Sequence, residues 1–302
     1  MIAPEPLSPN FPAVAQALAK ELDAAGFNAD GIAAHLGPEA TEALYRREPG
    51  VVLAVCSDDA RLSRLIRFFV LRRPATAEAL GEMLTPKLAL SLIDDHLVLP
   101  VPDSSTYRIA VEVRPHVVAG TPRLVLSDLD ASMTDRVPGR DHVLGVGSAS
   151  LSLLSATPCT PVDSVLDLGT GSGVQALAQA DNATHVVATD VHGRALEFAE
   201  ATLRANGVDN VELRQGEWFD PVQGELFDRI VANPPFVVGL PEVGHVYRDS
   251  GLDLDGATEL VLSQAPEHLA EGGRAFILGS WVHALDQPWQ SRVASWLPSH
   301  GV

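Results

Sequence analysis

The sequence predicts an α/β fold, in which a doubly wound parallel sheet follows a smaller N-terminal α+β domain. Short apolar runs suited to buried parallel strands alternate with helix-forming stretches through the second half of the chain. One apolar run, Val165–Leu168, ends in a glycine-rich loop at 169–173. Another run, at 227–232, ends in the segment NPPF at 233–236. Loops that follow the strands of such a sheet are where ligands bind.

The glycine-rich loop has the features of a nucleotide-type cofactor site. Gly169, Gly171 and Gly173 let the backbone turn tightly and approach a ligand without Cβ collisions. A helix-forming stretch follows at 174–180, so a bound ligand would meet the free N–H groups of a helix N-terminus. The next strand ends at Asp190, whose carboxylate is placed to accept hydrogen bonds from ribose hydroxyls.

The spacing of the loop separates two cofactor classes. The dinucleotide fingerprint G-x-G-x-x-G requires a glycine at position 174, which is Val174 here. The loop instead reads G-x-G-x-G and follows Asp167. A carboxylate at this point disfavours a pyrophosphate and suits a ligand that bears an ammonium group. The loop therefore favours S-adenosylmethionine, which has an ammonium, a sulfonium and no phosphate, over NAD.

The NPPF segment has the groups needed to hold a flat amino nitrogen. Asn233 can offer its side-chain carbonyl, and Pro234 its backbone carbonyl, to the two N–H bonds of an amide or base amine. Two such acceptors would direct the nitrogen lone pair and stabilise the positive charge that develops during attack. Pro234 and Pro235 stiffen the loop, and Phe236 offers a flat face for stacking. The alternative is a turn that merely ends the strand.

The two segments become one site if their strands are neighbours. Ligands of a doubly wound sheet bind at the carboxyl ends of the strands where the strand order reverses. If the strands at 165–168 and 227–232 lie side by side at that point, the glycine loop and NPPF face one crevice.

Four motifs occur in order: DLGTGSG (167–173), TD (189–190), GEWF (216–219) and NPPF (233–236). Through them the chain, from about Asp141 to about Trp281, resembles the class I S-adenosylmethionine-dependent methyltransferases. It is similar to the NPP(F/Y) branch, which includes HemK-like release-factor glutamine methyltransferases and ribosomal-RNA guanine-N2 methyltransferases. The resemblance implies a Rossmann-like sheet, S-adenosylmethionine as cofactor and methyl transfer to nitrogen. It also implies a catalytic role for Asn233, Pro234, Pro235 and Phe236.

The resemblance further implies which residues bind the cofactor. Asp167 would face the methionine end, Asp190 would hold the ribose, and the loop would contribute Gly169, Thr170, Gly171 and Gly173. Glu217 and Trp218 would border the adenine, although the family more often has Asp at position 217. Trp218 and Phe219 have the alternative role of core aromatics.

Three further segments have weaker signals. Residues 145–154 resemble the family's lead-in helix, which covers the cofactor carboxylate, with Ser148 and Ser152 as candidate contacts or simple caps. The polar segment 247–256 is a candidate substrate lid or an ordinary loop. His283 is expected to be a surface histidine rather than a base.

Composition restricts the remaining possibilities. The 302-residue chain is 46% hydrophobic, enough for one large domain or two smaller ones. Two cysteines, Cys56 and Cys159, provide neither a disulfide framework nor a metal-ligand cluster, so we expect a reducing cytoplasm and no metal. The sequence shows no signal peptide and no apolar run long enough to span a bilayer, and no membrane partner is expected.

The charge is unevenly divided. Residues 1–140 have 14 Lys and Arg against 18 Asp and Glu, a net −4, whereas residues 141–302 have 7 against 21, a net −14, and no lysine. An acidic catalytic half will not hold a phosphate backbone, so the N-terminal half would have to deliver a nucleic acid. Its candidates are Arg61, Arg64 and Arg67, at helical spacing on one flank, for which a solvated helix rim is the alternative.

The N-terminal half is predicted to form a substrate-recognition domain over residues 1–138, with the methyltransferase domain at 139–302. From about residue 74 to residue 113, the sequence predicts two helices, a strand, a turn and a second strand, an order that resembles a winged-helix unit. A pair of strands is predicted next, at 113–129. The fifth strand of the methyltransferase sheet, at 274–281, is followed by a helix at about 288–297 and by no recognisable sixth or seventh strand. The domain is therefore expected to be C-terminally incomplete or to have its edge completed by another element.

The preferred substrate is an exocyclic amine of an RNA base, free or ribosome-associated. Phe236 favours it, since the glutamine-modifying branch usually has Tyr there, whereas the acidic half favours a protein glutamine amide. A cofactor-binding interaction module without turnover is the alternative of another class.

Overall fold

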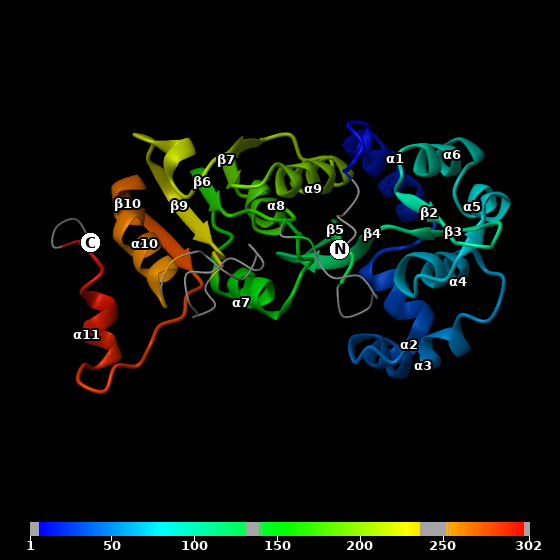
Figure 1. The fold of residues 1–302 in the computed structure, drawn as a ribbon, viewed down its shortest axis with the longest axis horizontal. Helices are drawn as coiled ribbons and strands as arrows, with labels where there is room; N and C mark the ends of the chain where they lie inside the picture. Colours follow the sequence, from blue (N-terminus) through cyan, green and yellow to red (C-terminus); the bar gives the residue numbers. More distant parts are fainter. Residues whose placement is uncertain (1–5, 131–138, 140, 236–251, 253, 299–302) are drawn as a thin grey trace.

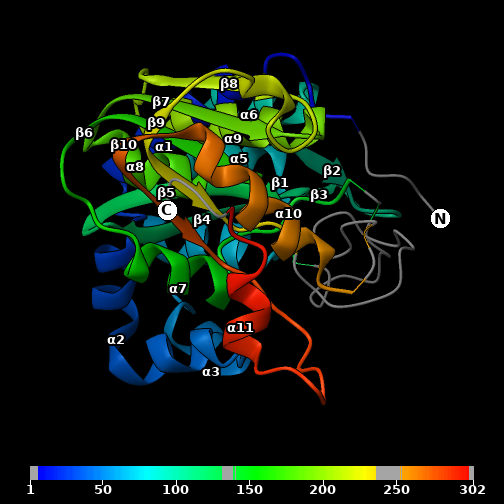
Figure 2. The same ribbon diagram turned by 90° about the vertical axis from the view of Figure 1, so that its left-hand side faces the viewer.

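The computed structural model describes residues 6–130, 139, 141–235, 252 and 254–298. The N-terminal helices lie at one end of the molecule, the parallel sheet lies at the other, and helix α9 lies between them (Figure 1). In Figure 2 the sheet end faces the viewer.

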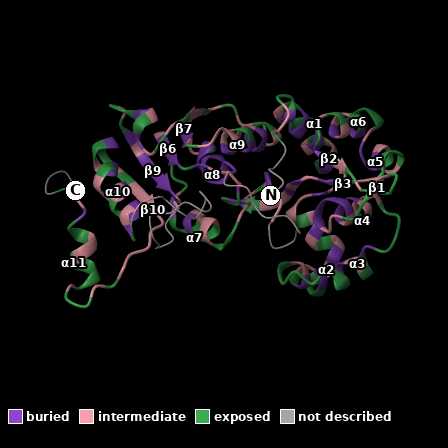
Figure 3. Ribbon diagram, viewed as in Figure 1, coloured by how far each residue is buried: buried purple, intermediate pink, exposed green. Residues whose placement is uncertain are grey.

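Five parallel strands form the central sheet. They are β6 (Val162–Leu168), β7 (Ala183–Asp190), β8 (Val211–Gln215), β9 (Phe227–Ala232) and β10 (Leu269–Ile277). Their order is β10-β9-β6-β7-β8, and every neighbouring pair is parallel. The order reverses between β6 and β9, so the predicted doubly wound sheet is confirmed. Figure 3 shows that β6, β7 and β9 are largely buried, as strands covered on both faces must be.

The helices and short 3₁₀ turns around the sheet are α7 (Ser148–Ala156), α8 (Val174–Ala180), α9 (Gly193–Ala205), η3 (Asp220–Val222), α10 (Gly256–Gln264), η4 (Ala265–His268) and α11 (Trp289–Ala294). Alternate residues of β6 enter different cores. Leu166 and Leu168 pack in the cluster that contains Val261 of α10. Val165 packs in the cluster that contains Leu153 of α7 and Ala176 of α8. Because side chains alternate along a strand, Asp167 belongs to the face covered by α7 and α8.

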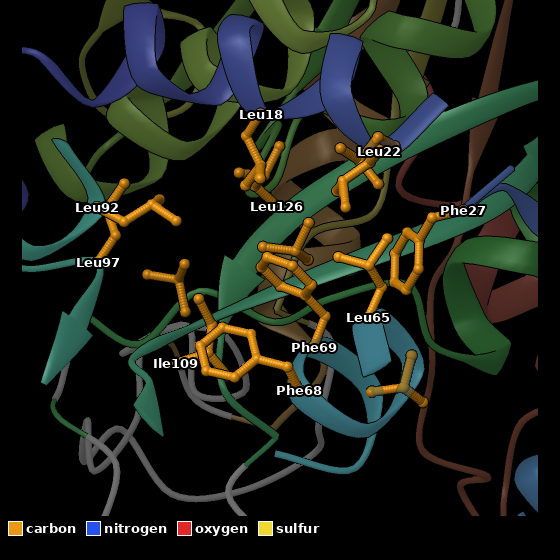
Figure 4. Packing of buried hydrophobic residues seen from close by; sticks show 14 of the residues in the cluster. Leu18, Leu22, Phe27, Leu65, Phe68, Phe69, Leu92, Leu97, Ile109 and Leu126 are labelled. Carbon is orange, nitrogen blue, oxygen red and sulfur yellow. The ribbon is translucent and has the colours of Figure 1, made fainter. Parts of the chain in front are cut away.

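The N-terminal region consists of α1 (Phe11–Ala24), α2 (Ala29–Tyr45), α3 (Pro49–Val55), α4 (Arg61–Leu65), the π-helix η1 (Ile66–Val70), β1 (Ala75–Thr76), α5 (Ala77–Met83), α6 (Pro86–Asp94), β2 (Val98–Pro100) and β3 (Thr106–Ile109). The three strands form an antiparallel sheet in the order β1-β3-β2. The succession α5, α6, β2, β3 matches the order expected from the sequence. Figure 4 shows the hydrophobic core of the N-terminal region. Leu22, Phe27, Phe69, Leu92 and Leu97 belong to this one cluster of buried residues.

The arginines of 61–67 are half-buried and have partners in their own region. The single helix expected there is α4 followed by the π-helix η1. Arg61 donates to the Met83 carbonyl at 2.7 Å and forms an ion pair with Glu21 at 2.8 Å. Arg64 forms an ion pair with Glu82 at 2.8 Å, and Arg67 donates to the carbonyls of Cys56 and Asp58. These guanidinium groups are partly exposed and are paired with groups of their own region, as is compatible with a solvated rim, and they do not form a row of unpaired cations.

A hairpin of β4 (Val111–Val118) and β5 (Thr121–Asp128) connects the N-terminal region to the sheet through α9. The N–H of Leu124 donates to the side chain of Asn206 at 2.9 Å, and the N–H of Leu126 donates to Thr202 at 3.1 Å. The outer edge of β5 is thereby satisfied by side chains of α9 and its C-terminal cap. The predicted boundary at Pro138 lies outside the described residues.

The C-terminal end of the sheet starts earlier than predicted. β10 begins at Leu269 rather than at 274, and α11 is shorter than the helix expected at 288–297. Within the described residues β8 and β10 are the two edge strands, and no sixth or seventh strand is present. No helix in the described part of the chain has both the length and the apolar character needed to cross a membrane.

Candidate cofactor and substrate site

The glycine loop and the NPP segment start side by side at the carboxyl edge of the sheet. Strands β6 and β9 are neighbours, and Leu168, the last residue of β6, pairs with Ala232, the last residue of β9. Gly169 and Asn233 therefore leave adjacent strands at the same level. The two loops were expected to face one crevice if their strands are neighbours, and β6 and β9 are neighbours.

The three loop glycines serve two purposes. Gly169, Gly171 and Gly173 have φ values of +74°, +54° and +81°, in the left-handed region that favours glycine. A Cβ on Gly169 or Gly171 would have no neighbour within 4 Å, so the space in front of these residues is open. A Cβ on Gly173 would lie 3.1 Å from Cα of Ala199, so this glycine lets α9 pack against the loop.

The loop is anchored to the end of β7. The N–H groups of Gly169 and Thr170 donate to the carbonyl of Thr189 at 3.0 and 2.8 Å. Oδ2 of Asp190 accepts from the N–H of Gly171 at 3.0 Å, and its Oδ1 accepts from the N–H of His192 at 3.0 Å. Burial raises the pKa of Asp190. Each carboxylate oxygen has a second lone pair, so the group assigned to the ribose can still accept hydrogen bonds.

Asp167 is a buried carboxyl with one oxygen to spare. Its side chain is 1% exposed, and Oδ2 accepts from the Thr170 hydroxyl at 2.6 Å and from the N–H of Ala176 at 2.9 Å. Oδ1 is buried and has no hydrogen-bond partner among the described residues. Burial raises the pKa of Asp167 to about 6, and the charge of Asp190 contributes in the same direction. A buried, unpaired acceptor of this kind suits a cationic ligand group.

Trp218 and Phe219, which follow β8, differ in their surroundings. Phe219 is 1% exposed and stacks on His268 with ring centroids 4.7 Å apart, so it is a core residue. Trp218 is half-buried at the edge of the same core and has a φ of +47°, a strained conformation for a tryptophan. Glu217 is exposed. The structure places Glu217 and Trp218 just beyond the carboxyl end of β8, the edge that also bears the glycine loop.

The NPP residues follow β9 directly. Asn233 and Pro235 are half-buried, and Pro234 is buried. Phe236 lies outside the described residues, as does most of the candidate lid at 247–256. His283 is exposed, as expected for a surface histidine.

The contact between the lead-in helix α7 and helix α8 involves a residue that sequence reasoning missed. Ser148 is the first residue of α7, and the Ser152 hydroxyl donates to its carbonyl at 2.9 Å, so neither serine caps the helix. Instead Gln175 of α8 donates from Nε2 to the Ser150 carbonyl at 3.0 Å. Gln175 is 3% exposed, and its Oε1 has no partner among the described residues. The available signal was a glutamine inside the otherwise apolar start of a buried helix.

Comparison with known proteins identifies two regions. Residues 144–284 match the family model "Methyltransferase small domain", and residues 24–109 match "Domain of unknown function (DUF7059)". A release factor glutamine methyltransferase of Aliivibrio fischeri is 36% identical over 141 residues, which cover 43% of this chain and 48% of that protein. A ribosomal RNA small subunit methyltransferase C of Citrobacter koseri is 36% identical over 157 residues, which cover 51% of this chain and 41% of that protein.

Among solved structures, a 16S rRNA N2 methyltransferase of T. thermophilus, in complex with AdoMet and guanosine, has a TM-score of 0.44 and 23% identity. The match covers 65% of this chain and 53% of that chain. The chain spans about half the length of the release factor glutamine methyltransferases that it matches. Residues 144–284 therefore form a domain of the methyltransferase small-domain family, within the class I S-adenosylmethionine-dependent methyltransferases.

Proposed function

We propose that this protein transfers a methyl group from S-adenosylmethionine to a planar amino nitrogen. One observation carries the proposal: the glycine loop and the NPP segment leave neighbouring strands at paired residues, Leu168 and Ala232. A cofactor on the first loop and an amino group on the second would then be adjacent.

The residues present fit this cofactor. The unpaired Oδ1 of Asp167 can accept from an ammonium group, and Asp190 can accept from ribose hydroxyls. The open space before Gly169 and Gly171 admits a ligand against the backbone. The carboxyl of Asp167 just before the loop disfavours the pyrophosphate of a dinucleotide. Glu217 and Trp218 would border the adenine, and Thr170 would act by holding Asp167.

The bound cofactor supplies an electrophilic methyl group; the chain's own groups prepare the nucleophile. The side-chain carbonyl of Asn233 and the backbone carbonyl of Pro234 accept the two N–H bonds of the amino group. This arrangement turns the nitrogen lone pair toward the methyl group and stabilises the positive charge that develops on nitrogen. Pro235 keeps the segment rigid, and Phe236 stacks on the planar group. No strong base is required, because the proton leaves a nitrogen that methylation has already made acidic.

For the substrate we propose an exocyclic amine of an RNA base, in a ribosome-associated RNA and in the cytoplasm. Phe at position 236 supports this assignment, as does the winged-helix-like order of α5, α6, β2 and β3. Relatives named for ribosomal RNA also support it. The N-terminal region, over residues 1–138, would deliver the RNA.

A protein glutamine amide is the second candidate, and the distribution of charge favours it. Residues 141–302 have a net charge of −14 and no lysine. Arg61, Arg64 and Arg67, the candidates for phosphate contacts, are held by groups of their own region. Relatives named as release factor and ribosomal protein uL3 glutamine methyltransferases agree with this alternative.

A tritiated-methyl assay on separated RNA and protein fractions tests the proposal. Label in RNA supports the base amine, and label in protein, recovered as methylglutamine, supports the second candidate. Calorimetry on the same preparation tests the cofactor. Failure to bind S-adenosylmethionine, together with tight binding of NAD, would overturn the proposal as a whole.

A further inference from the structure

Gln175 is the buried polar side chain that the proposed chemistry leaves without a role. It lies in the first turn of α8, directly after the glycine loop, and is 3% exposed. Its Nε2 donates to the backbone carbonyl of Ser150 at 3.0 Å, whereas its Oε1 is buried without a partner among the described residues. Buried acceptors are normally paired, so an unpaired one beside a ligand loop points to a donor that the ligand brings.

The orientation of the amide is fixed by its neighbour. The two ends of a glutamine amide are interchangeable in shape, but the Ser150 carbonyl can only accept a hydrogen bond. The nitrogen must therefore face Ser150, and the oxygen is the atom left unpaired.

Gln175 directly precedes a residue whose backbone contacts Asp167. The N–H of Ala176, the residue after Gln175, donates to Oδ2 of Asp167 at 2.9 Å. Ser150 lies in the first turn of α7, which covers the same face of the sheet as α8. Two buried acceptors, Oδ1 of Asp167 and Oε1 of Gln175, thus occur within one helical turn of the glycine loop, and neither has a partner among the described residues.

We propose that Gln175 is a second acceptor for the ammonium group of the cofactor and acts together with Asp167. The inference rests on the proposed function, because it takes S-adenosylmethionine as the ligand. An ammonium group has three N–H donors, so one carboxylate oxygen cannot satisfy it alone. The amide oxygen supplies a second acceptor without adding another negative charge beside Asp167 and Asp190. Through its Nε2, the same side chain also ties α8 to the first turn of α7.

The test compares two ligands that differ in the amino-acid group. S-adenosylhomocysteine has the ammonium and the carboxylate, whereas 5′-methylthioadenosine has the adenosyl thioether and neither of those groups. Calorimetry gives the ratio of the two dissociation constants for the whole protein. Gln175→Met, which preserves length and removes the acceptor, should weaken binding of S-adenosylhomocysteine by roughly 10- to 100-fold. Binding of 5′-methylthioadenosine should remain at the wild-type value.

Two variants separate ligand binding from packing. The side chain of Gln175→Glu is buried, so we expect it to stay protonated: its O–H then donates to the Ser150 carbonyl in place of Nε2, and its other oxygen remains an acceptor. This variant should therefore retain most of the preference for S-adenosylhomocysteine that Gln175→Met loses. Gln179→Leu is the matched control: this glutamine lies one turn further along α8, is 1% exposed, and its Oε1 already accepts from Arg229 at 2.6 Å. It should lower thermal stability without changing the ratio. Gln179→Leu also shows how the ratio of the two dissociation constants responds to a loss of packing in α8.

The outcomes separate failure of the role proposed for Gln175 from failure of the proposed function. If Gln175→Met weakens both ligands equally or neither, Gln175 only ties α8 to α7 and the ammonium assignment is wrong. The same conclusion follows if Gln175→Glu binds as poorly as Gln175→Met. If Gln175→Met does not fold, the Gln175→Glu ratio decides alone, because loss of the preference there overturns the proposal. If the wild type binds neither ligand, the proposed function itself fails.

Discussion

Polar side chains of the N-terminal helices and of the glycine loop differ in their burial and in their hydrogen-bond partners. In the N-terminal helices, Arg61, Arg64 and Arg67 each have carboxylate or carbonyl partners from their own region. At the glycine loop, Asp167 and Gln175 are more deeply buried, yet each has an oxygen without a partner among the described residues. The paired guanidinium groups contribute to the stability of the N-terminal helices, whereas the unpaired acceptors beside the glycine loop are available to a ligand.

The largest expected effect is on the substrate side of the site. Asn233→Ala removes one of the two acceptors proposed for the amino group, so turnover should fall by about 100- to 1000-fold, about 3–4 kcal/mol. Affinity for S-adenosylmethionine should be unchanged, because Asn233 is not among the proposed cofactor contacts. Methyl transfer and calorimetry on the same preparation measure both quantities.

Asn210→Ala is the matched control for this variant. The Asn210 amide donates to the carbonyls of Ala180, the last residue of α8, and Ala183, the first residue of β7, both at 2.9 Å. Its loss should reduce stability and leave the turnover of the folded enzyme near the wild-type value. If Asn233→Ala kept wild-type turnover, Asn233 would not be an acceptor for the amino group.

The next effect concerns the pH dependence of stability at Asp167. Its pKa of about 6 in the folded protein lies above the ordinary value of 3.8. The folded state therefore binds the proton more tightly, and this stabilisation is present below about pH 3.8 and is lost as the pH rises through about 6. A shift of about two units corresponds to about 3 kcal/mol. Asp167→Asn should stabilise the free protein at pH 7.5 by about 1–3 kcal/mol, and by much less at pH 4.

Thermal unfolding at the two pH values measures this difference, and calorimetry should show that the same variant has lost affinity for S-adenosylmethionine. Cofactor binding to the wild type should strengthen as the pH rises through about 6, because an ammonium group favours the ionised carboxyl. A variant that is less stable than the wild type at pH 7.5 and binds the cofactor equally well would show that Asp167 is satisfied within the fold.

A smaller effect separates packing glycines from ligand-facing ones. Gly173→Ala places a Cβ 3.1 Å from Cα of Ala199 at a left-handed φ, so it should lower the free energy of unfolding by about 2 kcal/mol or more. Gly171→Ala meets no neighbour within 4 Å, so its cost in stability should be limited to backbone strain of about 1–2 kcal/mol. Its main effect should be weaker cofactor binding. If both variants lost cofactor affinity equally, Gly171 and Gly173 would not differ in the way proposed.

The smallest effect is expected in the N-terminal helices. Arg61→Met removes the bonds to Met83 and Glu21 and should reduce the free energy of unfolding by about 1–2 kcal/mol. Cofactor affinity and transfer of label to RNA should not change, because this guanidinium is held within the region. A selective loss of RNA methylation in a variant of normal stability would return Arg61 to the role of a phosphate contact.

Much of the sheet could be predicted because its signals are local. The strand at 227–232 and the helix at 174–180 have the predicted bounds, since apolar runs and helix formers act over a few residues. The early start of β10 was missed because Leu269–Gly273 includes two glycines, a composition that does not read as a strand. The π-helix after α4 was missed because its apolar run fits an ordinary helix equally well.

By itself, the sequence determined which loops follow buried strands, which cofactor class suits the acid before the glycines, and which residues can hold an amino nitrogen. These properties depend on residue type and short spacing. Only the tertiary structure decided that β6 and β9 are neighbours, that the arginines of 61–67 have partners, and that Asp167 and Gln175 each have an unpaired oxygen. Pairing and burial depend on residues far apart along the chain, and no local pattern encodes them.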